Sequence, residues 1–370
     1  MREGRWHNSA LNTLRHCEQK FTYEYIDRLS RPTSDVNVPM LLGSWFHALM
    51  QGQGLKQGEA QATLLERPEV IDLGIDNLEP LFTAKYETGA DWPAIIHNYI
   101  KDYHHAYMVG MDEEIDALPE RVWFLYQRYT ARWFSEGSFA TDKVLGVEVQ
   151  WERTDETTGI KYGGKVDRVV QREDGMVVLR DHKTTSRTSS SDFRLTNSQM
   201  HLYAWGLAPW LHNLTGEEPI AVEYDYAITR EPKVRLTKAG NLYKNQTVLD
   251  EHALYVLLGD TLKQGDYDYG PDDERFNEHY VKAVEEGNET FFYRRLLPVN
   301  ETVIRTLLTE SNELINHSLL LPEERTPIRN TGMHCDWCQF QSLCVADYYG
   351  NDTSELVKDY VLGDPVSETR

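Results

Sequence analysis

The sequence lacks any long hydrophobic run. No apolar stretch approaches the roughly 18–20 residues that a membrane-spanning helix requires. Residues 1–17 contain no apolar signal-peptide core, and the chain shows no internal repeat and no low-complexity segment. We therefore expect a cytoplasmic globular protein that does not contact a membrane. Its 370 residues are enough for one large domain or two ordinary ones.

Basic residues are scarce relative to acidic ones. The chain has 38 Lys and Arg against 59 Asp and Glu, which gives a formal net charge of −21. Non-specific binding of nucleic acid depends on basic surface, so the composition argues weakly against it. A local basic groove or a metal site could still neutralise phosphate. The 21 Tyr and 9 Trp could stack on unpaired bases, although most aromatic residues fill cores.

Cysteine is also rare, with four residues in the chain. Cys335, Cys338 and Cys344 form a C-x2-C-x5-C motif, and Cys17 stands alone near the N-terminus. Disulfides are unusual in cytoplasmic proteins, so clustered thiols indicate a metal. The spacing fits a structural zinc and an iron–sulfur cluster about equally well. The remaining alternative is four unrelated buried thiols, three of them close together by chance.

The segment 165–183 predicts a β-hairpin. Two β-patterned runs, 165–170 and 176–183, flank the turn residues 173–175. A three-residue loop would place Asp167 opposite Asp181, whereas a two-residue turn would shift this register by one residue. Because side chains alternate along a strand, Lys183 shares a face with Asp181.

Two converging carboxylates beside an ammonium group indicate a Mg²⁺ or Mn²⁺ site, because these ions prefer oxygen ligands and keep positions open for water and phosphate. The alternative is that Asp167 and Asp181 are exposed hairpin charges. The valines of both runs argue against it, because they predict that the strands are buried on at least one side. A buried Asp needs a partner.

Other segments predict further helices and strands. We expect helices over 9–29 (capped by Ser9), 41–50 (capped by Ser44), 197–211, 247–264 and 299–321, and strands over 144–151 and 220–229. Cys17 should point inward from the first helix, as core filler or as a ligand. His47 alone would more often be a satisfied core residue than a ligand. Glu148 could approach the metal or be an ordinary strand carboxylate.

The remaining segments carry no obvious chemistry. Residues 51–140 read as mostly helical, and the adjacent His104 and His105 point in different directions on a helix, so they are not a natural chelate. We expect polar loops over 184–196 and 322–333 and a partly mobile acidic tail beyond residue 350.

Six short motifs extend over almost the whole chain, and each is weak alone. They are the helix 9–25 with Cys17, the G-x3-H of Gly43 to His47, the G-x2-D of Gly164 to Asp167, the D-x-K of Asp181 to Lys183, the Q-x3-Y of Gln199 to Tyr203, and the C-x2-C-x5-C of Cys335 to Cys344. In this order they resemble the RecB-like branch of the PD-(D/E)XK nuclease superfamily. The resemblance is to members with an iron–sulfur cluster, such as CRISPR-associated and AddB-type exonucleases and their phage-encoded relatives.

The resemblance implies roles for individual residues. The metal ligands for Mg²⁺ or Mn²⁺ would be His47, Asp167, Asp181 and the backbone carbonyl of His182, a position where relatives often have Tyr. Lys183 would hold the attacking water or the scissile phosphate. The two remaining motif residues, Gln199 and Tyr203, would orient Lys183 and contact DNA. The four cysteines, Cys17, Cys335, Cys338 and Cys344, would hold a 4Fe–4S cluster rather than zinc.

The resemblance also implies a fold and its division. We expect an α/β fold with a restriction-endonuclease-like core, in which helices flank a central mixed sheet, a helical insertion and a C-terminal iron–sulfur segment. The expected parts are N-terminal helices with Cys17 and His47 (1–50), a helical insertion (51–140), the catalytic core (141–235), a helical C-terminal part (236–330), the iron–sulfur segment (331–350) and an acidic tail (351–370).

The function that the resemblance implies is a metal-dependent DNA exonuclease. It would act on single-stranded DNA or duplex ends in recombination, replication or repair, and a recombination or replication protein could be its partner. Two alternatives stay open. One is a catalytically silent module that binds DNA or a protein partner on the same fold, and the other is a nuclease with the same active site that zinc stabilises.

Overall fold

A computed structural model describes most of the chain. The described residues are 5–30, 37–61, 90–135, 142–186, 198–216, 221–232, 291–319, 321 and 325–362, with 238, 256–257 and 274. Much of the predicted insertion, the predicted loop from residue 187 onward, the predicted helix 247–264 apart from 256–257, and the tail beyond 362 lie outside these residues. Within the described ranges, no helix combines the length and the apolar character that crossing a membrane requires.

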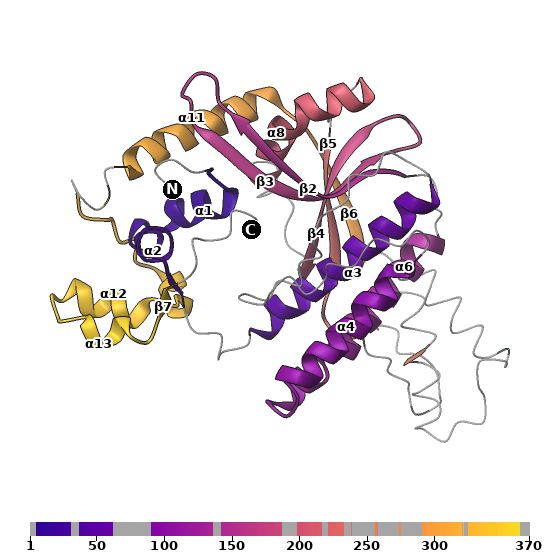
Figure 1. The fold of residues 1–370 in the computed structure, drawn as a ribbon, viewed down its shortest axis with the longest axis horizontal. Helices are drawn as coiled ribbons and strands as arrows, with labels where there is room; N and C mark the ends of the chain where they lie inside the picture. Colours follow the sequence, from indigo (N-terminus) through magenta and orange to yellow (C-terminus); the bar gives the residue numbers. More distant parts are fainter. Residues whose placement is uncertain are drawn as a thin grey trace.

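A five-stranded mixed sheet forms the centre of the fold, in the order β2-β3-β4-β5-β6 (Figure 1). The strands are β2 (Lys143–Thr154), β3 (Lys161–Gln171), β4 (Val177–Thr185), β5 (Ala221–Ile228) and β6 (Phe292–Pro298). Only β4 and β5 pair in parallel, and the other neighbours pair antiparallel. The mixed α/β class predicted from the sequence is therefore confirmed.

The hairpin between β3 and β4 has the register of a three-residue loop. Val170 pairs with Val178 and Arg168 pairs with Arg180, so the positions on either side of Asp174 correspond. Gly175 has a φ of 84°, a conformation that glycine adopts without steric cost. One further step along this register brings Asp167 level with Asp181.

Helices cover both faces of the sheet (Figure 1). On one face, α3 (Val38–Ala60), α4 (Trp92–Tyr107) and α6 (Leu118–Ser135) share an apolar core with the ends of β5 and β6, and α5 (Glu113–Asp116) precedes α6. On the other face, α1 (Asn8–His16), α8 (Ser198–Thr215) and α11 (Glu301–Ser318) pack on β2 to β5. All eight residues of β5 are buried, as expected for a strand covered on both faces.

The predicted helix over 9–29 is wrong, because the chain breaks at Cys17. Cys17 is extended, with φ −164° and ψ 113°, between α1 and α2 (Glu18–Phe21). A π-helix (Thr22–Ile26) follows α2. The N-cap of α1 is His7, and Ser9 lies inside the helix. Cys17 is half-buried and does not lie on a continuous apolar helix face.

The second helix is longer than the sequence predicted. The predicted cap Ser44 lies inside α3, which begins at Val38 and runs across the expected boundary at residue 50. The Asn37 side chain accepts the backbone N–H of Met40 at 3.1 Å near the start of the helix. Asn37 therefore caps the N-terminus of this helix, the role that the sequence analysis assigned to Ser44.

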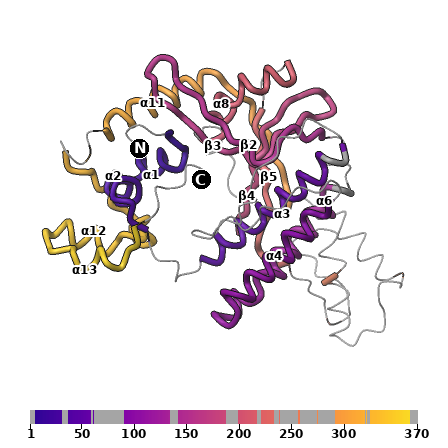
Figure 2. Tube along the Cα trace, viewed as in Figure 1, coloured from indigo at the N-terminus to yellow at the C-terminus, as the bar shows by residue number. Residues whose placement is uncertain are grey.

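The C-terminal part departs from prediction once. Residues 236–330 were expected to be helical, and they contribute the edge strand β6 as well as α11, which matches the predicted helix 299–321. In the tail beyond residue 350, the structure describes α13 (Ser354–Val357) and β7 (Val361–Leu362). β7 pairs with β1 (Leu29–Ser30) and so joins the two ends of the chain (Figure 2). Before α13 come a 3-10 helix (Met333–Trp337) and α12 (Gln341–Tyr348).

Candidate active site

Asp167 lies between two other carboxylates on neighbouring strands. Asp181 is level with it on β4. On β2, Val147 pairs with Arg168 and Val149 pairs with Val166, so Glu148 faces Asp167 in the register. The side chains of Glu148 and Asp167 are 10% and 13% exposed. Three acidic residues thus lie on adjacent strands, close enough for the charge of Asp181 to act on Asp167 and that of Asp167 on Glu148.

Glu148 stands in an unusual stretch of backbone. The register of β2 shifts between Val144 and Gly146, and Glu148 has a φ of 52°. A non-glycine residue rarely adopts this conformation within a strand. Its carboxylate pairs with Lys165 on β3 at 2.6 Å. The sequence left the role of Glu148 open, because an alternating apolar pattern gives no sign of a positive φ at this position.

Lys183 and Gln199 both reach Asp181. The Lys183 Nζ lies 2.6 Å from Asp181 Oδ2, since both side chains project from the same face of β4. The Gln199 amide on α8 donates to Asp181 Oδ1 at 3.2 Å and lies 3.0 Å from the Tyr203 hydroxyl. Lys183 also lies 3.5 Å from Gln199 Oε1. The four motif residues therefore form one connected group of side chains.

His47 approaches the carboxylates from α3. Its Nδ1 lies 3.4 Å from Asp167 Oδ2. Gly43, one turn earlier, explains how the helix comes this close. A Cβ at position 43 would lie 2.9 Å from the Thr184 Oγ1 on β4. Gly164 has a similar role on β3, because a Cβ there would lie 2.8 Å from the Tyr203 ring. Both glycines of the sequence motifs thus allow close approach of site elements.

His182 contributes to the site through its backbone. Its N–H donates to Asp167 Oδ2 at 2.7 Å. Its side chain points to the opposite face of β4 from Asp181 and Lys183, where it is buried with Nδ1 3.4 Å from Asp225 Oδ2. The sequence predicted a ligand role for the carbonyl alone and gave no role to this imidazole.

Burial and like charge act on the titrating groups. Burial and the negative charge of Asp181 raise the pKa of Asp167 to about 7. Burial also raises the pKa of Glu148, against the opposing charge of Lys165, and lowers the pKa of His47. Burial and the charge of Asp181 raise the pKa of Tyr203, so its hydroxyl stays protonated. Burial therefore disfavours the charged forms of Asp167, Glu148 and His47.

These residues suit a divalent cation in their chemistry. Carboxylate oxygens and a neutral imidazole are donors for Mg²⁺ or Mn²⁺, and a cation would relieve the repulsion that raises the pKa of Asp167. Among the described residues, however, no three His, Cys, Asp or Glu side chains are arranged as ligands of one ion. Asp181 and Glu148 instead pair with Lys183 and Lys165. Metal binding by Asp181 or Glu148 would require the paired lysine to move away from the carboxylate.

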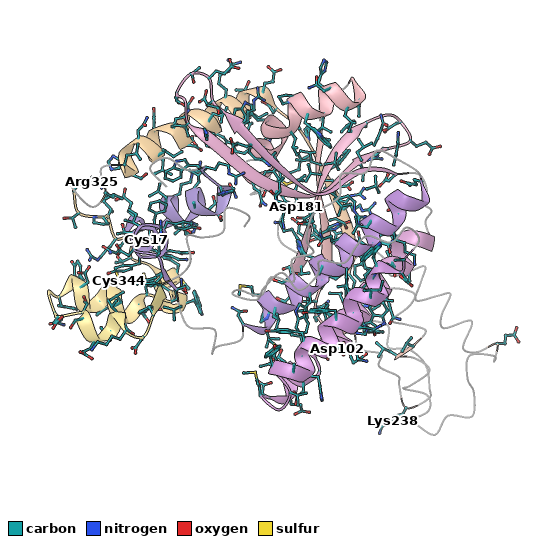
Figure 3. The ribbon with its side chains drawn as sticks, viewed as in Figure 1. Cys17, Asp102, Asp181, Lys238, Arg325 and Cys344 are labelled. Carbon is teal, nitrogen blue, oxygen red and sulfur yellow. The ribbon has the colours of Figure 1, made fainter. Side chains whose placement is uncertain are left out.

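The cysteines lie apart from the carboxylates. Figure 3 shows Cys17 and Cys344 close together on the side of the molecule that holds α12 and α13. All four thiols are free and half-buried. Burial and the neighbouring charges of Cys17 and Cys338 raise the pKa of Cys344, whereas a hydrogen bond from Arg329 opposes this rise. Cys335 lies in the 3-10 helix, and its carbonyl accepts the Cys338 N–H at 3.1 Å.

Two long-range contacts hold Cys17 beside the C-terminal segment. The Glu18 carboxylate pairs with Arg325 at 2.6 Å and accepts the Ile328 N–H at 2.8 Å. The Cys17 sulfur lies 4.0 Å from the carbonyl oxygen of Ile328, 311 residues away. The structure thus brings Cys17 near Cys338 and Cys344. Thiols suit zinc or an iron–sulfur cluster in their chemistry, although no three thiols among the described residues are arranged as ligands of one ion.

Comparisons with known proteins bear on the family of the chain. A family model described as "PD-(D/E)XK nuclease superfamily" matches residues 5–345. A solved structure titled "Crystal structure of SSO0001" is 13% identical, with 68% of this chain and 81% of that chain covered and a TM-score of 0.27. No curated protein sequence matches at a significant level.

Proposed function

The chain belongs to the PD-(D/E)XK nuclease superfamily, and we propose that it is a metal-dependent exonuclease of the RecB-like branch. Its substrate would be single-stranded DNA or duplex DNA ends, in recombination, replication or repair. The observation that carries the proposal is the position of Asp167 between Glu148 and Asp181, with Lys183 2.6 Å from Asp181. This arrangement unites the two central motifs of the sequence.

Mg²⁺ or Mn²⁺ would be held by His47, Asp167 and Asp181, with the carbonyl of His182. Glu148 adds a carboxylate that the sequence did not assign. Such an ion offsets the negative charge of the phosphoryl group and lowers the pKa of a bound water. The raised pKa of Asp167 supports the assignment, because a cation would stabilise the ionised carboxylate that burial and the charge of Asp181 disfavour.

Three protein groups would act on the substrate. Lys183 would stabilise the charge that develops on the scissile phosphate, or hold the attacking water. Gln199 would orient Lys183 and Asp181, since it contacts both. Tyr203 would fix the Gln199 amide, and its hydroxyl stays protonated and so remains a hydrogen-bond donor. Tyr203 and Gln199 would also contact DNA.

The four cysteines would hold a 4Fe–4S cluster that joins the two ends of the chain. The neighbourhood of Cys17, Cys338 and Cys344 supports this assignment, and the positive charge of Arg329 beside Cys344 would offset thiolate charge. The cluster would be structural. Metal analysis separates this proposal from the zinc alternative, because iron and zinc are measured independently.

A nuclease assay tests the proposal. Anaerobically purified protein would be incubated with end-labelled single-stranded DNA and Mn²⁺, Mg²⁺ or EDTA, beside the isosteric variant Asp181→Asn. We expect metal-dependent shortening from one end that EDTA and Asp181→Asn abolish. If neither ion supports cleavage by the intact protein, the nuclease proposal fails, and a DNA- or partner-binding module becomes the better account.

A further inference from the structure

The buried face of β4 carries a second cluster of polar side chains, directly behind the candidate active site. Asp225 on β5 is its centre, with a side chain that is 0% exposed. It lies opposite His182 in the parallel β4–β5 pairing and opposite Arg294 in the β5–β6 pairing. The nuclease chemistry described above makes no use of this carboxylate.

Two hydrogen-bond donors and a ring nitrogen of His182 surround one oxygen of Asp225. The Tyr129 hydroxyl on α6 donates to Oδ2, the Arg294 Nε lies 3.2 Å from it, and the His182 Nδ1 lies 3.4 Å from it. Arg294 is itself held over the Trp133 ring, 4.0 Å from its centroid. A carboxylate with three partners from three elements is fixed in position.

His182 links this cluster to the metal site. Its imidazole packs edge-to-face against His47, with ring centroids 6.2 Å apart, and against Tyr129 at the same distance. Its backbone N–H is the donor to Asp167 described above. A displacement of His182 would therefore move the ring that supports His47 and the group that orients Asp167.

We propose that Asp225 is a positioning residue for the nuclease centre. It holds His182, which in turn keeps the His47 ring and the Asp167 carboxylate in place for metal binding. This inference rests on the proposed function. Outer partners of this type fix the orientation of metal ligands, and their loss typically weakens metal binding or activity about 10–100-fold. Asp225 would thus affect metal affinity through the imidazole of His182, without contacting the carboxylates or the substrate.

Glu223 offers a matched control on the same strand. It lies two residues before Asp225, on the same face, and its side chain is 6% exposed. It pairs with Arg180 and lies 3.9 Å from Arg294. It therefore shares the burial and the arginine partners of Asp225, but its own register partner on β4 is Arg180 rather than His182. A purely structural role predicts equal effects of Asp225→Asn and Glu223→Gln.

The test compares wild type, Asp225→Asn and Glu223→Gln as full-length proteins. Mn²⁺ binding is measured by electron paramagnetic resonance, DNA cleavage is titrated with Mn²⁺, and thermal midpoints are recorded. We expect Asp225→Asn to raise the Mn²⁺ dissociation constant about tenfold or more. We expect Glu223→Gln to change it less than about threefold with a comparable loss of thermal stability.

Equal Mn²⁺ affinities in Asp225→Asn and Glu223→Gln would overturn the inference while wild-type cleavage upholds the nuclease proposal. If wild type neither binds Mn²⁺ nor cleaves DNA, the proposed function itself fails and the inference with it. If Asp225→Asn does not fold, Tyr129→Phe decides, because it removes one hydrogen bond to Asp225. We expect weaker Mn²⁺ binding than wild type in Tyr129→Phe, and wild-type affinity there would overturn the inference.

Discussion

Lys183 Nζ lies 2.6 Å from Asp181 Oδ2, two residues away on the same face of β4. The pairing places a positive charge against a carboxylate that we assign to a divalent ion. Lys165 on β3 forms a second ion pair, with Glu148 on β2, also at 2.6 Å. The two ion pairs flank Asp167, so substitutions of Lys183 and Lys165 can be compared directly.

We predict that Lys183→Met lowers DNA cleavage about 10²–10³-fold, because it removes a charge next to the reacting phosphate. The same change should leave Mn²⁺ binding intact or stronger, since Asp181 is freed. Lys165→Met also frees a carboxylate but should reduce cleavage far less. Single-turnover rates at saturating Mn²⁺ measure both variants. Equal losses in the two would mean that Lys183 has no special role.

Gly43→Ala tests whether the position of α3 controls DNA cleavage. The new methyl group would lie 2.9 Å from Thr184 Oγ1, so α3 would shift and carry His47 with it. We expect at least a tenfold loss of cleavage and about 1–3 kcal/mol of stability, as for other overpacked sites. Activity assays and chemical denaturation report these two quantities.

Gly52→Ala is the control for Gly43→Ala. A methyl group at position 52 would lie 2.7 Å from the Ile96 side chain on α4, on the far side of the same helix from the site. It should cost stability without a comparable loss of cleavage. The double variant Gly43→Ala/Thr184→Ala removes the clashing hydroxyl and should recover activity. No recovery would show that Gly43 acts in another way.

The raised pKa of Asp167 predicts a pH dependence. At pH values between the ordinary 3.8 and about 7, the folded protein keeps a proton that the unfolded chain has lost. The stability contributed by this group is therefore present at low pH and is lost as the pH rises toward 7. Mn²⁺ needs the ionised carboxylate, so its affinity should rise over the upper part of this window.

The isosteric variant Asp167→Asn isolates this effect from other titrating groups. For the metal-free proteins, the melting temperature of wild type minus that of Asp167→Asn should fall between pH 5 and pH 7. Asp181→Asn removes the neighbouring charge. The melting temperature of Asp181→Asn minus that of the double variant Asp181→Asn/Asp167→Asn should therefore fall at lower pH than the wild-type difference does. A difference that stays constant with pH would contradict the raised pKa.

Cys17→Ser should strip the C-terminal segment of its metal. The four thiols would form one site, so the loss of one ligand should remove most of the iron and lower the thermal stability and solubility. Iron and zinc contents of anaerobically purified protein are the measurements. His334→Gln, in the same segment but not a thiol, should retain the metal. Unchanged iron in Cys17→Ser would show that Cys17 only packs.

The hairpin that carries Asp167 and Asp181 was predictable from the sequence for a physical reason. Its strands alternate, and a three-residue loop ending in glycine sets the register, so local residues decide which side chains meet. The proximity of Gln199 and Tyr203 was equally predictable, because positions four apart share a helix face. The family resemblance supplied the roles, which geometry alone does not give.

Features that depend on distant residues were not predictable. β6 contains two adjacent arginines, which do not indicate a buried strand in the sequence. Arg294 is accommodated there because it pairs with Asp225 on the neighbouring strand β5. The break at Cys17 is compensated by contacts of Glu18 with residues more than 300 positions away. The position of Glu148 opposite Asp167 likewise appears only once β2 and β3 are paired.

The position of a bound metal would test the proposed site directly. Crystals of the protein soaked in Mn²⁺ would be measured by anomalous diffraction, beside crystals of Asp181→Asn. We predict an anomalous peak within ligand distance of Asp167, Asp181 and His47, with Lys183 displaced from Asp181, and no such peak in the variant. A well-occupied Mn²⁺ elsewhere, with the Lys183–Asp181 ion pair intact, would contradict this prediction.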